Sequence, residues 1–225
     1  MLIQRIHQSQ KGFSLIEILV ALALVSLVLT VVVGDGFSSR SKLEESTSMI
    51  ERSLRLSVDE AALRNVITRV NFKLDGEVQE FAVEYGPDAD FVIPTALVKI
   101  DLVESLAEQE ARLEANKKVD KDFNRIKELS EDTLKIEEPI RVLGVGTKVT
   151  GKFIPEGNAS IYVYPTGERD AAFIAISTDQ EIAVLTSEAF TDQIDLNYYK
   201  VENNSSFANR LEKANDLFKD WLNEK

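Results

Sequence analysis

The sequence predicts an α+β fold: a long N-terminal helix packed on an antiparallel β-sheet domain, with a helical insert and a C-terminal helix. Three observations predict it. An apolar run fills residues 13–33, and an amphipathic pattern of helical period continues over residues 34–65. Short runs rich in β-branched and aromatic residues then alternate with turn residues over 66–200. The chain is therefore expected to contain an anchor, a stem and one β domain.

The N-terminal apolar run is long enough to cross a membrane. Phe13 to Val33 is 21 residues, which as a helix extends ~31 Å, close to the ~30 Å of a bilayer core. Arg5 and Lys11 precede the run, and no basic residue follows it until Arg40. The N-terminus is therefore expected to stay cytoplasmic and the rest to be exported, as a single-pass inner-membrane protein with a periplasmic domain.

The leader, residues 1–12, ends at Gly12, and no small-x-small cleavage site closes the apolar run as in an ordinary secretory signal. We expect cleavage at the front of the run, between Gly12 and Phe13. Glu17 lies inside the apolar stretch, where a carboxylate costs about 2.5–3.5 kcal/mol on insertion scales and is normally paired. The new α-amine of Phe13, one helical turn away or on a neighbouring subunit, is the expected partner. The alternative is a plain signal anchor with an incidental glutamate.

The segment Gly12-Phe13-Ser14-Leu15-Ile16-Glu17, followed by about twenty apolar residues, resembles the class III signal of type IV pilins and type II secretion pseudopilins. The resemblance implies a pilin-like fold and cleavage by a prepilin peptidase after Gly12. It also implies N-terminal methylation of Phe13 and a role for Glu17 as the assembly or registry carboxylate. In that family the apolar helix becomes the core of a filament.

Composition narrows the possible functions. The chain of 225 residues has a formal net charge of −12, and the leader contains two basic and no acidic residues, so the processed form carries −14. Such a surface repels phosphates, and no nucleic acid partner is expected. There is no cysteine, and the single histidine is His7 in the leader. Cysteine- and histidine-based catalytic arrangements cannot form after cleavage, and we expect no catalytic residues, cofactor or metal.

The stem, residues 34–65, is expected to be an amphipathic helix. Gly34 and Gly36 interrupt good helix formers, at about 1 kcal/mol each relative to alanine, so a local softening is expected there. The apolar residues at helical spacing are Leu43, Ile50, Leu54, Val58, Ala61 and Ala62.

A β-hairpin should follow the stem, because the period changes to two around the turn Asp75-Gly76. The alternating apolar residues are Val70, Phe72 and Leu74 before the turn, and Phe81, Val83 and Tyr85 after it. Asp88 and Asp90 end this region. They are a turn or, alternatively, two calcium ligands, although the twelve-residue pattern of a calcium loop is absent.

Residues 95–136 interrupt the β pattern with dense charge and apolar residues mostly at helical spacing, among them Phe123, Ile126 and Leu129. We interpret this stretch as one or two inserted helices. Two roles remain open: a solvated excursion that covers a sheet edge, or an arm that docks a partner.

From residue 140 the strand pattern returns, with Gly144-Val145-Gly146 expected to be one of the separating turns. The expected strands are Ile140–Leu143, Val149–Ile154, Ala159–Tyr164, Ala171–Ser177 and Glu181–Leu185. The tail, residues 201–225, is expected to form an amphipathic helix. Its Trp221 would anchor the apolar face on the chain's own sheet or on a neighbouring subunit.

The phrase from Ile161 to Ala172, with Phe190-Thr191 further on, resembles the C-terminal β region of H-type minor pseudopilins (GspH) and FimT-like minor pilins. Together with the hairpin phrase from Val66 to Gly76, the likeness covers roughly Phe13–Ile194, apart from the helical insert. The resemblance implies a minor pseudopilin, a non-catalytic subunit of the type II secretion pseudopilus that helps to export folded proteins. Its partners would be a prepilin peptidase, other major and minor pseudopilins, and the inner membrane.

Two alternative functions stay open. One is a FimT-like minor pilin of a type IV pilus, some of which handle DNA. The other is a membrane-anchored periplasmic enzyme that uses a pair of carboxylates for acid–base chemistry.

Overall fold

The computed structural model describes residues 14–87, 91–94, 105–126, 133–202 and 205–224, without the side chains of residues 29–38 and 109. The chain divides into two units, Met1–Arg40 and Ser41–Lys225, which are described separately. The expected leader, with Gly12 and Phe13, lies outside the described residues. So do Asp88, Asp90 and Leu129.

Helix α1 extends over Leu15–Arg64 and includes positions 34 and 36, so the two glycines do not end it. The helix ends at Arg64 because of the backbone conformation of the next residue. Asn65 adopts a left-handed backbone conformation with φ of 52°. The N–H of Val66 then donates to the carbonyl of Ala61 at 3.3 Å. This pairing is the helix-ending motif in which asparagine can replace glycine.

The stem part of α1 buries a narrower and more polar face than its pattern predicts. Leu43, Ile50, Leu54 and Ala61 are buried as expected, whereas Ala62 is exposed. The same face also buries small hydroxyl side chains, which let a helix approach a sheet closely. Ser53 Oγ donates to the carbonyl of Met49 at 2.9 Å, within the helix, whereas Ser57 Oγ shares a hydrogen bond of 2.7 Å with the hydroxyl of Thr68 in the sheet. The buried hydroxyl residues of the stem are Ser46, Thr47, Ser53 and Ser57.

Within the described residues, the strands form two antiparallel sheets of five strands each, where the sequence predicted one antiparallel sheet domain. In the first sheet the order is β3-β2-β1-β7, and β4 also pairs with β2. Its strands are β1 Thr68–Lys73, β2 Gln79–Tyr85, β3 Asn124–Arg125, β4 Leu134–Ile136 and β7 Asn158–Val163. The predicted hairpin is β1–β2, with Phe72 opposite Phe81 and Gly76 in the turn at φ of +99°.

The second sheet has the order β10-β9-β8-β5-β6. Its strands are β5 Arg141–Thr147, β6 Phe153–Ile154, β8 Ala172–Ser177, β9 Glu181–Ser187 and β10 Ile194–Lys200. Strand β10 lies beyond the last expected strand, Glu181–Leu185.

The prediction that Gly144-Val145-Gly146 forms a turn is wrong, because all three residues lie inside β5. A Cβ added at Gly144 would lie 2.5 Å from the ring of Phe153, and one at Gly146 would lie 2.4 Å from the ring of Phe218. The two glycines therefore provide space for aromatic rings on the outer face of the second sheet.

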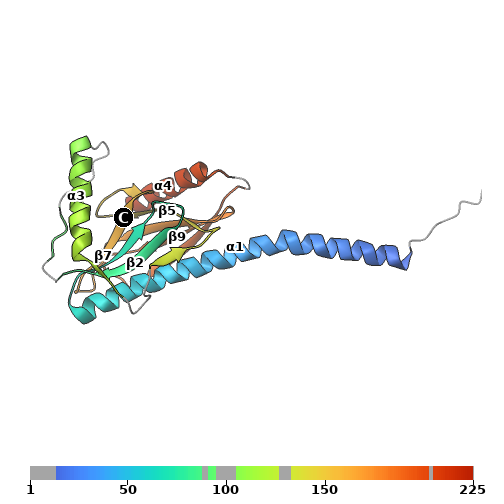
Figure 1. The fold of residues 1–225 in the computed structure, drawn as a ribbon, viewed down its shortest axis with the longest axis horizontal. Coiled ribbons are helices and arrows are strands. Elements are labelled where there is room, and N and C mark those ends of the chain that lie inside the picture. The colour runs from blue at the N-terminus through green and yellow to red at the C-terminus, as the bar shows by residue number, and fades with distance from the viewer. Residues whose placement is uncertain (1–13, 88–90, 95–104, 127–132, 203–204, 225) are drawn as a thin grey trace, which may run out of the picture. The chain divides into compact units, whose positions relative to one another are not determined.

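The two sheets and the stem of α1 share one core, because their inward residues form a single cluster. Alternate residues of β8 show the layering: Ile174 belongs to this core, whereas Phe173 faces helix α4, Phe207–Asn223. Figure 1 shows α4 beside β5. Trp221 of α4 packs 5.8 Å from the ring of Phe173, so the C-terminal helix is anchored on the chain's own sheet.

The insert is partly helical and partly strand. Helix α3, Leu106–Asp122, is followed by Phe123 in an extended conformation, and β3 and β4 then pair with β2. Phe123 and Ile126 therefore follow the helix, contrary to the prediction that places them at helical spacing. Phe123 packs with Val119 on the outer face of the first sheet, whereas Ile126 enters the main core. The described part of the insert thus covers the edge of β2, one of the two expected roles.

Candidate functional site

The first turn of α1 contains the described part of the predicted N-terminal site. The N–H of Glu17 donates to Ser14 Oγ at 3.2 Å and to the Ser14 carbonyl at 3.0 Å. Ser14 therefore occupies the N-cap position, and Ser-x-x-Glu is the sequence of a capping box. Glu17 lies at the third helical position, where the helix dipole favours negative charge. The helix begins at Leu15, close to the predicted cleavage position between Gly12 and Phe13.

The apolar surface that follows Glu17 is uncovered. Each large apolar side chain described between Leu15 and Val28 is between 52% and 78% exposed. Soluble monomers rarely expose contiguous apolar patches larger than a few hundred Å². A surface of this kind is suited to lipid chains or to other apolar helices. The exposed side chains are Leu15, Ile16, Ile18, Leu19, Val20, Leu22, Leu24, Val25, Leu27 and Val28.

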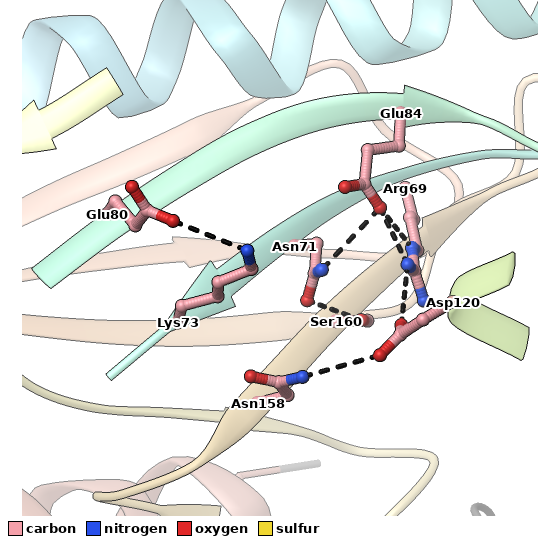
Figure 2. Close-up of polar contacts among 8 residues, drawn as sticks. All are labelled: Arg69, Asn71, Lys73, Glu80, Glu84, Asp120, Asn158 and Ser160. Atoms are coloured by element: carbon pink, nitrogen blue, oxygen red, sulfur yellow. Dashed lines mark hydrogen bonds and ion pairs between the residues drawn. The ribbon is translucent and has the colours of Figure 1, made fainter. Parts of the chain in front are cut away.

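A buried charged network joins α3 to the outer face of the first sheet (Figure 2). Arg69 of β1 is 2% exposed and forms ion pairs with Glu84 of β2 at 2.6 Å and with Asp120 of α3 at 2.7 Å. Its guanidinium also lies 4.3 Å from the ring centre of Phe123. Burial alone would lower the pKa of Arg69, but the nearby carboxylates, Glu84 first, outweigh it and raise the pKa.

Amide and hydroxyl groups complete this network. Asn71 donates to Glu84 at 3.5 Å and accepts from Ser160 at 3.1 Å, while Asn158 donates to Asp120 at 3.5 Å. The charges are therefore engaged with one another, and Arg69 has two carboxylate partners. Such a satisfied buried network stabilises one arrangement of α3 and the sheet. We interpret it as structural.

A pocket lies beside this network, between α3, β7 and the loop that joins β5 to β6. Its lining residues are Ile93, Arg112, Asn116, Val149, Thr150, Ile154, Asn158, Ser160, Tyr162 and Asp170. Asp170 is 6% exposed, and the N–H of Tyr162 donates to its carboxylate at 3.2 Å. Burial raises the pKa of Asp170 to about 6, opposed by that hydrogen bond.

Arg169, the residue before Asp170, holds the loop between β9 and β10 by hydrogen bonds to its backbone. Arg169 donates to the carbonyl oxygens of Glu188 at 3.2 Å, Thr191 at 2.5 Å and Gln193 at 3.0 Å. The same loop carries Phe190, which is 80% exposed. The fold thus brings together Arg169 and Phe190, two residues of the phrase that suggested the H-type resemblance. A buried arginine holds the backbone beside an exposed aromatic side chain.

Sequence reasoning missed Arg69, Glu84, Asp120 and Asp170. The alternation of Arg69 and Asn71 with apolar neighbours is typical of a strand with a solvent-facing side, and no local signal shows that α3 covers it. The one available signal was the pair Val119 and Phe123, spaced four apart at the end of a highly charged segment. Among the described residues, no group of three or more His, Cys, Asp or Glu side chains could hold a metal ion.

The comparisons with known proteins bear on the N-terminal segment. Residues 7–33 match the prokaryotic N-terminal methylation motif. This match supports a type IV pilin-like protein. It implies processing by a prepilin peptidase and assembly with other pilins, and it indicates membrane anchoring and a structural, non-enzymatic role. No curated protein and no solved structure matches the chain.

The match covers the positions of Gly12, Phe13 and Glu17, but it does not test their individual roles, which stay predictions. An N-terminal helix, antiparallel sheets and a C-terminal helix are consistent with an α+β pilin-like fold. In the part of the chain that the structure describes, no helix has both the length and the apolarity needed to span a membrane. The single transmembrane pass therefore also stays a prediction.

Proposed function

We propose that this chain is a minor pseudopilin, a non-catalytic subunit of the type II secretion pseudopilus. The observation that carries the proposal is the uncovered apolar surface of α1 from Leu15 to Val28, with Glu17 as its one acidic residue. This surface follows directly on the predicted cleavage site inside the matched methylation motif. The H-type resemblance of the β domain supports the minor role.

The proposed mechanism begins in the inner membrane, with the N-terminus in the cytoplasm and the β domain in the periplasm. A prepilin peptidase cuts between Gly12 and Phe13 and methylates the new amine. The apolar helix then leaves the lipid and packs among the helices of other pseudopilins. This step exchanges one apolar environment for another, so registry has to come from close packing and polar contacts.

Glu17 provides that registry. Its carboxylate would pair with the Phe13 amine of a neighbouring subunit, because a buried charge without a partner is strongly unfavourable. When two such helices pack side by side, only one axial offset places Glu17 of one subunit beside the Phe13 amine of the other. A helix surface of leucines and valines alone would allow many positions.

The β domain supplies lateral contacts in this proposal. Phe190 is an exposed aromatic side chain on a loop whose backbone Arg169 already holds. An apolar anchor on a pre-ordered loop loses little conformational entropy on binding. This loop is therefore the expected contact with an adjacent subunit.

The first test is processing. The full chain is produced with an active prepilin peptidase and, as the control, with a catalytically inactive one, and its intact mass is measured. The proposal expects a product that begins at Phe13 and carries one added methyl group, only with the active enzyme. A chain that keeps residues 1–12 in both cases would overturn it.

The second test separates secretion from pilus function. Deletion of the gene in its native host should impair the release of folded proteins and be complemented by the wild-type chain. Loss of surface pili with normal secretion would instead favour a type IV minor pilin. Salt-sensitive DNA binding by the purified chain would favour the FimT-like variant, which the net charge of −12 opposes.

A further inference from the structure

The pocket beside α3 combines apolar walls with a buried acid. Ile93, Val149 and Ile154 supply aliphatic surface, and Tyr162 adds an aromatic ring. The other lining residues are polar, and they come from α3, β7, the β5–β6 loop and, for Asp170, the segment between β7 and β8. The pocket lies wholly within the unit Ser41–Lys225 and includes no residue of the N-terminal motif.

Asp170 lines this pocket without a balancing positive charge. It is 6% exposed, and among the described residues the group that hydrogen-bonds its carboxylate is the N–H of Tyr162, with no ion pair. Arg69 and Arg169, by contrast, are both committed to other partners.

Arg112 also lines the pocket, from α3, but it does not neutralise Asp170. The pKa of Asp170 is raised by burial and lowered only by the Tyr162 N–H, and Arg112 has contacts of its own. A carboxylate that is ionised at neutral pH therefore lines the pocket without an ion pair among the described residues, and its hydrogen-bond donor is the Tyr162 N–H. Such a group is stabilised by any cation that can reach it.

We propose that this pocket binds a primary ammonium or guanidinium group on an aliphatic stem, with Asp170 as the counter-charge. The aliphatic walls match the stem, and Asn158 and Ser160 provide oxygens that can accept further N–H donors. The net charge of −12 favours the approach of cations. The cation is either a lysine or arginine side chain of another protein or a free small amine. Both sources share this chemistry.

The proposal goes beyond filament assembly and does not depend on it. A chain that is never cleaved after Gly12 would still present this pocket, because none of its lining residues lies in α1. Failure of the processing test and failure of the binding test are therefore distinguishable.

The test uses the full chain in an uncharged detergent at about pH 7.5, where Asp170 is ionised. The amide signal of Tyr162 is followed by NMR during titration with n-butylamine, and with n-butanol as the neutral analogue. The proposal expects a saturable shift with the amine and none with the alcohol. Equal shifts with both would overturn it.

Matched variants assign the site. Asp170→Asn keeps the shape of the side chain and an acceptor for the Tyr162 N–H, and it should weaken amine binding by about tenfold or more. Glu168→Gln removes an exposed carboxylate two residues away and should leave binding unchanged. Thermal unfolding of both variants verifies that they are folded. Unchanged amine binding by a folded Asp170→Asn variant would overturn the proposal.

A second arm identifies the source of the cation. A blocked Gly-Lys-Gly peptide is compared with the same peptide containing norleucine, which keeps the aliphatic stem without the charge. Saturable binding of the lysine peptide alone supports a protein side chain as ligand. Binding of butylamine without the lysine peptide supports a free amine, and binding of neither refutes the pocket's role.

Discussion

Arg69 of β1 and Asp120 of α3 are 51 residues apart in sequence and form an ion pair of 2.7 Å between the first sheet and the insert. The side chain of Arg69 is 3% exposed and that of Asp120 is 35% exposed, so the contact reaches from the buried sheet to the edge of the helix. Together with Phe123 it attaches α3, a helix whose remaining residues are mostly exposed. The stability of the insert therefore depends on this contact.

Replacing Arg69 by methionine should destabilise the protein strongly. The change leaves Glu84 buried without a cation, and removing one partner of a buried ion pair costs about 3–5 kcal/mol. The exposed pair of Arg55 and Glu51 on α1 is the control, for which Arg55→Met should cost about 0.5 kcal/mol or less. Urea unfolding of the two variants measures the difference in the free energy of unfolding. Equal losses for both variants would contradict a special role for Arg69.

Replacing Glu17 by alanine should leave cleavage after Gly12 largely intact and impair assembly. The carboxylate acts between subunits in the proposed filament, whereas the peptidase acts on one chain. Chemical cross-linking to other pseudopilins in the native host measures the effect, and Glu45→Ala, an exposed glutamate of the stem, is the matched control. Normal cross-linking of the Glu17 variant would refute the registry role.

Replacing Gly146 by alanine should disturb the contact between β5 and α4. The new Cβ would lie 2.4 Å from the ring of Phe218, and overpacking of this kind costs about 1–3 kcal/mol. Trp221, the single tryptophan, is packed beside Phe218, so its fluorescence should shift to the red. A second change, Phe218→Leu, should partly restore the emission of the Gly146 variant by creating space. If neither change alters the emission, the glycine does not provide space for the ring.

Asp170 should make the protein less stable as the pH rises. Its pKa is about 6 in the folded chain against an ordinary value of 3.8, so the folded form holds the proton more tightly than the unfolded form. The stabilisation is fully present below pH 3.8 and is lost as the pH rises to about 6, a change of up to about 3 kcal/mol.

Asp170→Asn should remove this dependence. The free energy of unfolding of the variant, relative to wild type, should rise by about 2–3 kcal/mol between pH 4 and pH 7 in urea titrations. Among the described residues, Tyr162, Tyr164 and Arg112 are titratable or charged groups near Asp170. Burial, then the charge of Asp170, raises the pKa of Tyr164 to about 12, so it stays neutral over this range. A difference that does not change with pH would show that Asp170 is not the cause.

The parts of the fold that local pattern predicts are those whose causes are local. The stem and C-terminal helices follow from apolar residues at helical spacing, and the β1–β2 hairpin follows from alternation around Asp75-Gly76. The strand β5 was misread because Gly144 and Gly146 are typical of turns. The two positions have no side chain because the rings of Phe153 and Phe218 occupy the space. Phe153 belongs to β6, and Phe218 belongs to a helix some seventy residues later.

The candidate site residues also separate into those with a local sequence signal and those without one. The N-terminal segment was identified from the sequence because cleavage motif, acid and apolar run are contiguous, so their spacing along the chain is their spacing in space. The ion pairs of Arg69 and the pocket of Asp170 were not found, because each is assembled from segments far apart in sequence.

The sequence by itself determined an N-terminal apolar helix with one acid in its first turn, a β-rich domain and an amphipathic end, since each depends on periodicity within a few turns or strands. Only the tertiary structure decided that the strands form two sheets around one core, that α3 is attached through Arg69, and that Asp170 is buried without a cation. Burial and pairing of a charge depend on which distant segments cover it, and no local period encodes that.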